Sequence, residues 1–154
     1  MAFVPGDIFQ VTDMIQEAPI TLGRPALTSL KSLITLKGKI AVIYAAHFFH
    51  LFDEQRCSEV AGRLALLLSH ESGSIIFGLN LGAPEAIVQT TPAGSMFCHS
   101  PATWKKMWRS CFAPGAVRVE AELVRGFQSM ARAYAGSSED KPNIWLLKWS
   151  LERM

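Results

Sequence analysis

The sequence has little net charge, no long uninterrupted hydrophobic run and few cysteines. Its 15 Lys and Arg residues nearly balance 13 Asp and Glu residues, and a net charge of +2 does not predict a nucleic-acid partner. The longest apolar run, Ile40 to Phe52, contains two histidines and is shorter than the roughly 20 residues of a membrane-spanning helix. Three irregularly spaced cysteines favour reduced thiols over a disulfide framework. We therefore expect neither a nucleic-acid nor a membrane partner.

A secretory signal is also not apparent, because Pro5, Gly6 and Asp7 interrupt the region where a basic and then an apolar segment would stand. Hydrophobic residues make up 49% of the chain and charged residues 18%, a balance that excludes intrinsic disorder. No internal repeat or linker divides the 154 residues. These features predict a single cytoplasmic domain over residues 1–154.

The stretch around Ile40 to Leu68 predicts a strand followed by a helix. Ile40 to Ala45 is apolar on both faces, as a parallel strand covered on both sides would be. Asp53 is a suitable N-cap for the next helix, which we expect to end at Gly73. The buried stripe of that helix would consist of Cys57, Val60, Ala61, Leu64, Leu67 and Leu68. A second strand, Ser74 to Gly78, would complete a βαβ unit.

The remaining segments predict further helices and strands. Residues Ala26 to Leu36 favour a helix, and Leu79 to Cys98 a glycine-bearing loop. Ser100 and Pro101 begin a helix whose buried side would carry Trp104, Met107, Trp108 and Cys111. Alternating residues from Val117 to Leu123 and the apolar segment Ile144 to Leu151 predict an antiparallel pair of strands. The expected fold class is α/β, with parallel strands, helices and a closing antiparallel hairpin.

Four local patterns together resemble the C-terminal half of class I S-adenosylmethionine-dependent methyltransferases, most closely the small-molecule methyltransferases of fungal secondary metabolism. Asp7-Ile8-Phe9 resembles the turn that contacts adenine in that family. The segment Gly38 to Ala45 resembles its fourth strand. The most specific pattern is Phe48 to Asp53 with Gln55. The last pattern, which resembles the segment covering the substrate, comprises Gly78, Gly82, Gly94, Phe97, His99 and Trp108.

The chain also departs from the family. It has no Gly-x-Gly-x-Gly turn and no acid at the end of a second strand to hold the ribose. We therefore expect the first two strands of the Rossmann-like fold to be missing from this sequence, either because it is truncated or because a second polypeptide supplies them. In that case Ile40 to Ala45 would be an unpaired apolar edge. We expect the isolated chain to be marginally stable, homo-oligomeric or prone to aggregation.

The resemblance implies that S-adenosyl-L-methionine is the cofactor and assigns residues to its site. Asp7 would accept a hydrogen bond from the adenine amine, with Ile8 and Phe9 beside the ring. Ala45, Ala46 and His47 would lie where the backbone approaches the methionyl part. Each assignment has a structural alternative: a turn-forming Asp after Pro-Gly, and ordinary packing after a strand.

His50 is the candidate catalytic residue, because a neutral imidazole accepts a proton from a hydroxyl as it is methylated. A core histidine bonded to backbone is the alternative. Phe49, Met96, His99 and Trp104 would bind a largely apolar acceptor, although Trp104 and Trp108 are spaced to pack against the sheet. His47, His50, Cys98 and His99 also suggest a metal site, but they lack the tight spacing of a zinc site, so no metal is expected.

Three functions remain open from the sequence. The first is methyl transfer from S-adenosylmethionine to a small apolar natural product, in complete, truncated or partner-dependent form. The second is a non-catalytic half-domain that binds a partner chain. The third is a methyltransferase-like fold that catalyses a reaction other than methyl transfer.

Overall fold

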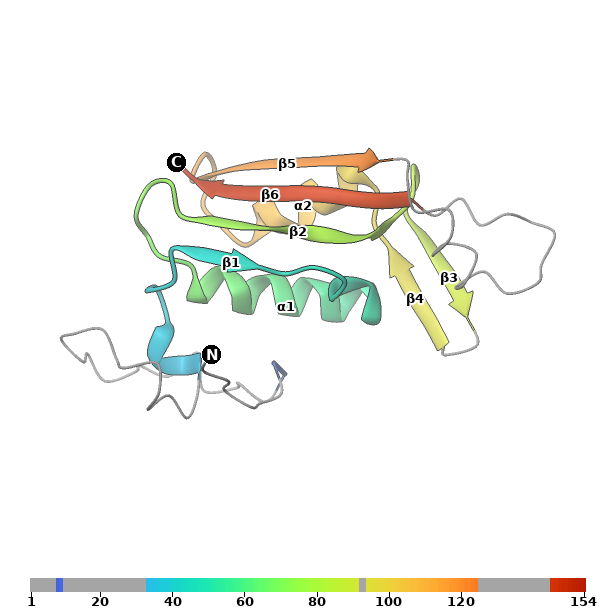
Figure 1. Ribbon diagram of the computed structural model, residues 1–154, viewed down its shortest axis with the longest axis horizontal. Coiled ribbons are helices and arrows are strands. Elements are labelled where there is room, and N and C mark those ends of the chain that lie inside the picture. The colour runs from blue at the N-terminus through green and yellow to red at the C-terminus, as the bar shows by residue number, and fades with distance from the viewer. Residues whose placement is uncertain (1–7, 10–32, 92–93, 125–144) are drawn as a thin grey trace.

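The computed structural model describes residues 8–9, 33–91, 94–124 and 145–154 (Figure 1). The predicted strand at residues 2–4 and the predicted loop at 137–142 lie outside these ranges. The described elements follow one another in the order η3 (Leu33–Leu36), β1 (Val42–Tyr44), η4 (Phe49–Leu51), α1 (Glu54–Leu67), β2 (Ile75–Gly82), β3 (Ile87–Thr91), β4 (Gly94–Cys98), α2 (Pro101–Ser110), β5 (Val117–Val124) and β6 (Trp145–Arg153), where η marks a 3₁₀ helix.

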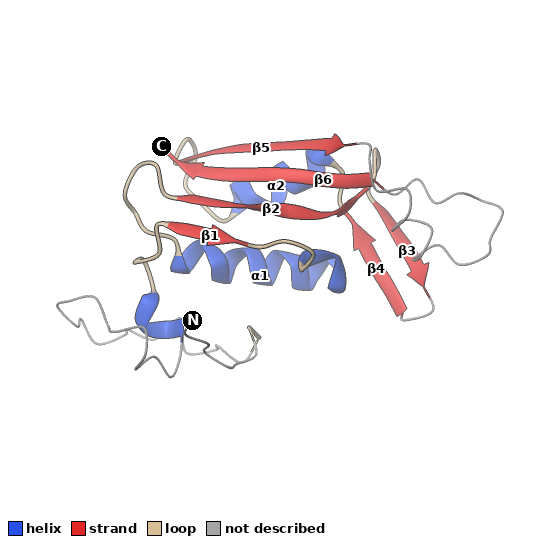
Figure 2. Cartoon of the chain, in the orientation of Figure 1, coloured by secondary structure: helices blue, strands red, loops and turns tan. Residues whose placement is uncertain are grey.

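The main sheet has four strands in the order β1-β2-β6-β5 (Figure 2). Strands β1 and β2 are parallel and joined through α1, which confirms the predicted βαβ unit. Strand β6 is antiparallel to both β2 and β5, as the predicted closing pair requires. The α/β fold class expected from the sequence is therefore confirmed.

Local capping explains where both α-helices begin. The Asp53 side chain accepts a hydrogen bond of 2.8 Å from the Arg56 amide at the start of α1. Ser100 caps α2 in a capping box with Thr103, and Pro101 occupies the first helical position. Both starts confirm the sequence prediction.

Four predicted boundaries or environments differ from the structure. Helix α1 ends at Leu67 rather than at Gly73, because Leu68 turns into extended backbone and pairs with Ile40. The predicted loop from Leu79 to Cys98 instead contains the end of β2 and a two-stranded sheet of β3 and β4. Strand β1 is shorter than predicted, and it is not covered on both sides, since Tyr44 is 64% exposed. Of the predicted helix at 26–36, only η3 lies within the described ranges, and it is a 3₁₀ turn.

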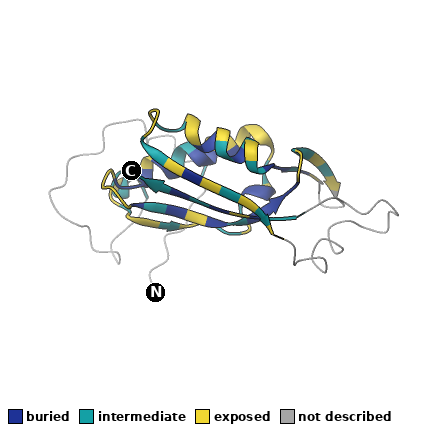
Figure 3. Cartoon of the chain, turned by 90° about the horizontal axis from the view of Figure 1, so that it is seen from above, coloured by how far each residue is buried: buried dark blue, intermediate teal, exposed yellow. Residues whose placement is uncertain are grey.

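Helices α1 and α2 pack on the same face of the main sheet, which we call the inner face (Figure 3). The predicted stripe of α1 is entirely buried there. On the same face, α2 contributes Trp104 and Trp108, which form a cluster of rings with Phe49 of η4 and Trp149 of β6 at centroid distances of 4.9–6.1 Å. Edge-to-face contacts of Phe49 with the three Trp rings and the stacking of Trp108 on Trp149 add to the burial of large apolar surfaces, so this cluster is the centre of the core.

The other side of the main sheet, the outer face, divides into two halves. Strand alternation and register place Val42, Tyr44, Ile75 and Phe77 together over β1 and β2. The half over β6 and β5 is charged, with ion pairs between Arg118 and Glu152, Arg118 and Glu120, and Lys148 and Glu122. A hollow of about 640 Å³ is lined from both halves, by Tyr44, Phe77 and Lys148 among others.

Within the described ranges, no helix has both the length and the apolar character needed to cross a membrane.

Candidate functional site

The candidate site is built around the turn that joins β1 to α1. Beyond the end of β1 the chain continues alongside β2, because the Ala45 amide donates to the Phe77 carbonyl at 2.9 Å and the His47 amide to the Leu79 carbonyl at 2.7 Å. His47 has φ of 51°, within the left-handed region that few residues other than glycine adopt. Such backbone strain is retained where the surrounding contacts impose it and is common at ligand sites.

A close backbone approach accompanies this turn. A Cβ atom on Gly78 would lie 1.9 Å from the Ala45 carbonyl oxygen, so only glycine fits opposite Ala45. Ala45 and Ala46 are half-buried and His47 is exposed. Ala45 and Ala46 therefore form a short segment of small residues between β1 and His47.

Asn80 of β2 is hydrogen-bonded to the next part of the turn, at Phe48 and Phe49. Its side-chain oxygen accepts hydrogen bonds from the amides of Phe48 and Phe49, both at 3.3 Å. The Asn80 side chain is 1% exposed, and its Nδ2 has no hydrogen-bond partner among the residues that the structure describes. A buried amide with an unused donor is uncommon and points to a site where another polar group can be bound.

His50 lies in η4 on the chain between His47 and α1. It is 6% exposed, and burial, followed by the charge of His47, lowers its pKa below the usual value of 6.5. The His47 and His50 rings meet edge to face with centroids 6.1 Å apart. His50 is therefore a neutral imidazole at pH 7, the form that a general base requires.

The predicted acceptor-binding residues lie in two different environments. Phe49 and Trp104 are each 1% exposed and belong to the aromatic core. Met96 of β4 belongs to a second, smaller cluster with Leu81, Ala83 and Cys98. Strand β4 nevertheless touches the site, because the Phe97 amide donates to the Phe52 carbonyl at 3.4 Å.

His99 follows β4 and contacts both regions. Its ring lies 5.2 Å from Trp104 and 4.7 Å from Phe97, and its Nδ1 is 3.1 Å from the Thr103 hydroxyl. Burial lowers the pKa of His99 to about 4. Its Nε2 has no hydrogen-bond partner in the described parts of the chain. His99 is thus a second neutral, buried imidazole.

The predicted adenine-side residues can be examined in part. Asp7 lies outside the described residues, whereas Ile8 and Phe9 pack against the core beside α1. The Phe9 ring lies 5.1 Å from that of Phe52, two residues after His50. The structure therefore brings Ile8 and Phe9 to the same turn as His50, from positions more than 40 residues away in the sequence.

Sequence reasoning did not identify Asn80 or Arg63. A single polar residue inside the apolar run from Ile75 to Leu81 was the available signal for Asn80. Arg63 has no such signal, because an arginine on an amphipathic helix is expected at its solvated face. No group of three or more His, Cys, Asp or Glu side chains within the described ranges could hold a metal ion.

Two curated relatives share sequence with the chain. It is 34% identical over 90 residues to "O-methyltransferase phiE" from Fungal sp. (strain ATCC 74256), covering 57% of this chain and 30% of that protein. It is 30% identical over 96 residues to "O-methyltransferase atr3" from Stereocaulon alpinum, covering 59% of this chain and 28% of that protein. The chain is therefore homologous to fungal O-methyltransferases over more than half of its length, and it spans less than a third of these relatives.

A solved structure, an S-adenosylmethionine-dependent methyltransferase from Mesorhizobium loti, aligns with a TM-score of 0.45 at 10% identity, covering 77% of this chain and 63% of that one. No family model matches the sequence.

Proposed function

We propose that the chain takes part in S-adenosylmethionine-dependent methyl transfer to a hydroxyl of a small, largely apolar natural product in secondary metabolism. The observation that carries this proposal is the homology to two fungal O-methyltransferases. The turn from Ala45 to Asp53, with its buried neutral imidazole, supports it. Ligands of open α/β sheets bind at the carboxyl ends of strands, which is where this turn lies.

The residues present fit one part of the cofactor. The backbone from Ala45 to His47 would lie along the methionyl part, next to the unused donor of buried Asn80. Ile8 and Phe9 would lie at the adenine, with Asp7 beside them. The sequence has no counterpart of the family's second strand and of the acid at its end that holds the ribose, so we propose that this contact comes from outside the chain.

When bound, the cofactor supplies an electrophilic methyl group to an acceptor atom aligned with its sulfonium. The part of this chain is to exclude water, to orient the acceptor and to take up its proton. His50 is the proposed general base, since its lowered pKa keeps it unprotonated at pH 7. Met96 and His99 are the proposed acceptor contacts on β4 and after it. Phe49 and Trp104 are enclosed in the core, so we propose that they support the acceptor-binding residues from behind.

Calorimetric titration with S-adenosylhomocysteine tests the proposal. Binding with a dissociation constant in the micromolar range is expected, and no detectable heat at millimolar ligand would contradict it. Incubation with S-adenosylmethionine and phenolic acceptors, read by product mass, distinguishes methyl transfer from other chemistry on the same fold. The variant His50→Asn tests the base, with a larger loss of kcat than of cofactor affinity expected.

A second candidate, a half-domain that binds a partner chain, is favoured by the outer face. Strand β1 lies at the edge of the main sheet, bonded on one side only among the described strands. Its Val42 and Tyr44 side chains are 60% and 64% exposed. Exposed apolar residues on an edge strand favour pairing with another chain. We propose that a second copy or another polypeptide completes the sheet at β1.

Sedimentation of the purified chain tests this pairing. Concentration-dependent association is expected for the native chain, and Tyr44→Lys should weaken it. Val88→Lys is the matched control, because Val88 is 67% exposed on the separate β3–β4 hairpin. A monomer at all concentrations, with a sharp melt at high temperature, would argue against a missing partner.

A further inference from the structure

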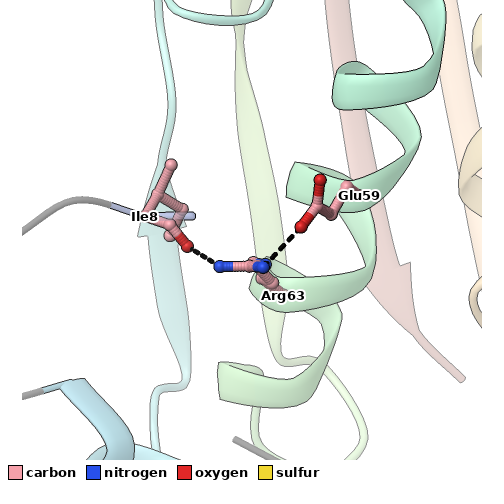
Figure 4. A network of polar contacts seen from close by, with 3 residues as sticks. All are labelled: Ile8, Glu59 and Arg63. Atoms are coloured by element: carbon pink, nitrogen blue, oxygen red, sulfur yellow. Dashed lines mark hydrogen bonds and ion pairs between the residues drawn. The ribbon is translucent and has the colours of Figure 1, made fainter. Parts of the chain in front are cut away.

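An arginine of α1 joins the short segment Ile8–Phe9 to the helix (Figure 4). The Arg63 guanidinium donates one hydrogen bond to the Ile8 carbonyl and a second to the Glu59 carboxylate. The donors are different nitrogens, Nη1 and Nη2, so one planar fork makes both contacts. The Arg63 side chain is only 13% exposed, although it stands on a helix whose neighbouring Glu59 is 46% exposed.

The aromatic ring of Phe9 strengthens the same junction. The guanidinium carbon of Arg56 lies 5.2 Å from the Phe9 ring centre, and that of Arg63 lies 5.6 Å from it. Both distances fall within the range of cation–π attraction. Phe52 contacts the same ring edge to face. Arg63 thus holds both the backbone of Ile8 and the ring of Phe9.

We propose that Arg63 is a positioning residue, which sets the place of the nucleoside-binding segment relative to the β1–α1 turn. This inference rests on the proposed function, in which Ile8 lies against adenine. Its particular content is that Phe9 anchors the segment to α1, because Phe9 is the residue whose ring the two arginines engage. Glu59, one helical turn before Arg63, orients the fork.

The geometry explains why an arginine stands at this position. A lysine would present a single ammonium and could not keep a planar fork directed at both a carbonyl and a carboxylate. It would also lose stacking against the Phe9 ring. Ile8 and Arg63 are 55 positions apart in the sequence, so this is a long-range contact, and its loss frees the segment without disrupting the helix.

The experiment compares Arg63→Gln, Arg63→Lys and a matched control, Arg109→Gln. Arg109 is exposed in the last turn of α2, away from Ile8 and Phe9. Two quantities are measured on each full-length chain: hydrogen exchange of the peptide that contains Ile8 and Phe9 without ligand, and affinity for S-adenosylhomocysteine. Arg63→Gln should speed the exchange and weaken affinity about tenfold, the scale of one charge-assisted hydrogen bond.

Arg63→Lys should have an exchange rate and an affinity between those of Arg63→Gln and the native chain, and Arg109→Gln should leave both unchanged. Equal exchange and equal affinity in Arg63→Gln and the native chain would overturn the inference and leave the proposed function standing. If the native chain binds no S-adenosylhomocysteine, the proposed function fails, while the exchange comparison still decides whether Arg63 anchors the segment. If Arg63→Gln does not fold, Arg63→Lys decides, and native behaviour in both measurements overturns the inference.

Discussion

The inner and outer faces of the main sheet are built from the same four strands but carry different side chains. The inner face holds Trp149, Leu147 and Ile76 under two helices, each at most 3% exposed. The outer face carries the apolar residues Tyr44 and Phe77 over β1 and β2, and charged residues that form ion pairs with one another over β6 and β5. Among the residues that the structure describes, the inner face therefore has a hydrophobic cover, whereas the apolar half of the outer face has none. The stability of the chain should come almost entirely from the inner face.

The largest expected difference between the faces is in the loss of an aromatic side chain. Trp104→Ala should reduce the free energy of unfolding by about 3–5 kcal/mol, because it removes a buried ring that contacts Phe49 and Trp149. Tyr44→Ala, on the outer face, should change it by less than about 1 kcal/mol. Urea unfolding of both variants measures the two values, and similar losses would mean that the outer face is covered in solution.

Packing against the inner face should also be sensitive to a single added methyl group at Gly78. In Gly78→Ala the new Cβ would meet the Ala45 carbonyl, so a loss of about 3 kcal/mol in the free energy of unfolding is expected. The matched variant is Gly62→Ala in α1, where a Cβ has no atom within 4 Å. That change should stabilise the chain by about 0.5–1 kcal/mol, since alanine is the better helix former. Thermal melts of the two variants should shift in opposite directions.

Helix α1 and the β3–β4 sheet show which parts of the fold the sequence can predict and which it cannot. The regular spacing of apolar residues was enough to place α1 and its buried stripe, because a helix of that length depends on local periodicity. The sequence predicts a loop where the structure has the β3–β4 sheet, because glycine and proline residues there are typical of turns and the pairing is decided by contacts between the two strands.

The parts of the candidate site formed by residues close in sequence can be predicted, whereas the contacts between residues far apart in sequence cannot. The turn from Ala45 to Asp53 could be located, because a buried strand, histidines and an N-cap follow one another directly. The contacts of Asn80 with Phe48 and of Arg63 with Ile8 join residues 32 and 55 positions apart. No periodicity carries such information, so only the folded chain reveals these contacts.

Acid should lower the free energy of unfolding through the buried His99 imidazole, which contacts Trp104 of the inner face. The pKa of this buried imidazole is lowered to about 4 in the folded chain, whereas its ordinary value is 6.5. Between these two values the unfolded chain binds more protons, so the free energy of unfolding falls as pH falls through this window. The full effect should be roughly 3 kcal/mol, reached near pH 4.

Urea unfolding at several pH values measures this dependence. The variant His99→Asn removes the titrating group and should flatten the curve between pH 6.5 and 4. Gly62→Ala, which alters no titrating group, is the control and should keep the native slope. An unchanged slope in His99→Asn would mean that the imidazole is hydrated in the folded chain.

The smallest expected effect concerns the charged half of the outer face. Lys148 and Glu122 form an ion pair of 3.0 Å across β6 and β5, with both side chains more than 60% exposed. A double-mutant cycle with Lys148→Ala and Glu122→Ala should give a coupling free energy of about 0.2–1 kcal/mol, because water and salt screen exposed charges. Raising the salt concentration to 1 M should reduce the coupling further. A coupling above about 2 kcal/mol that resists salt would show that this pair is dehydrated, and hence that a partner covers the charged half of the face as well as the apolar half.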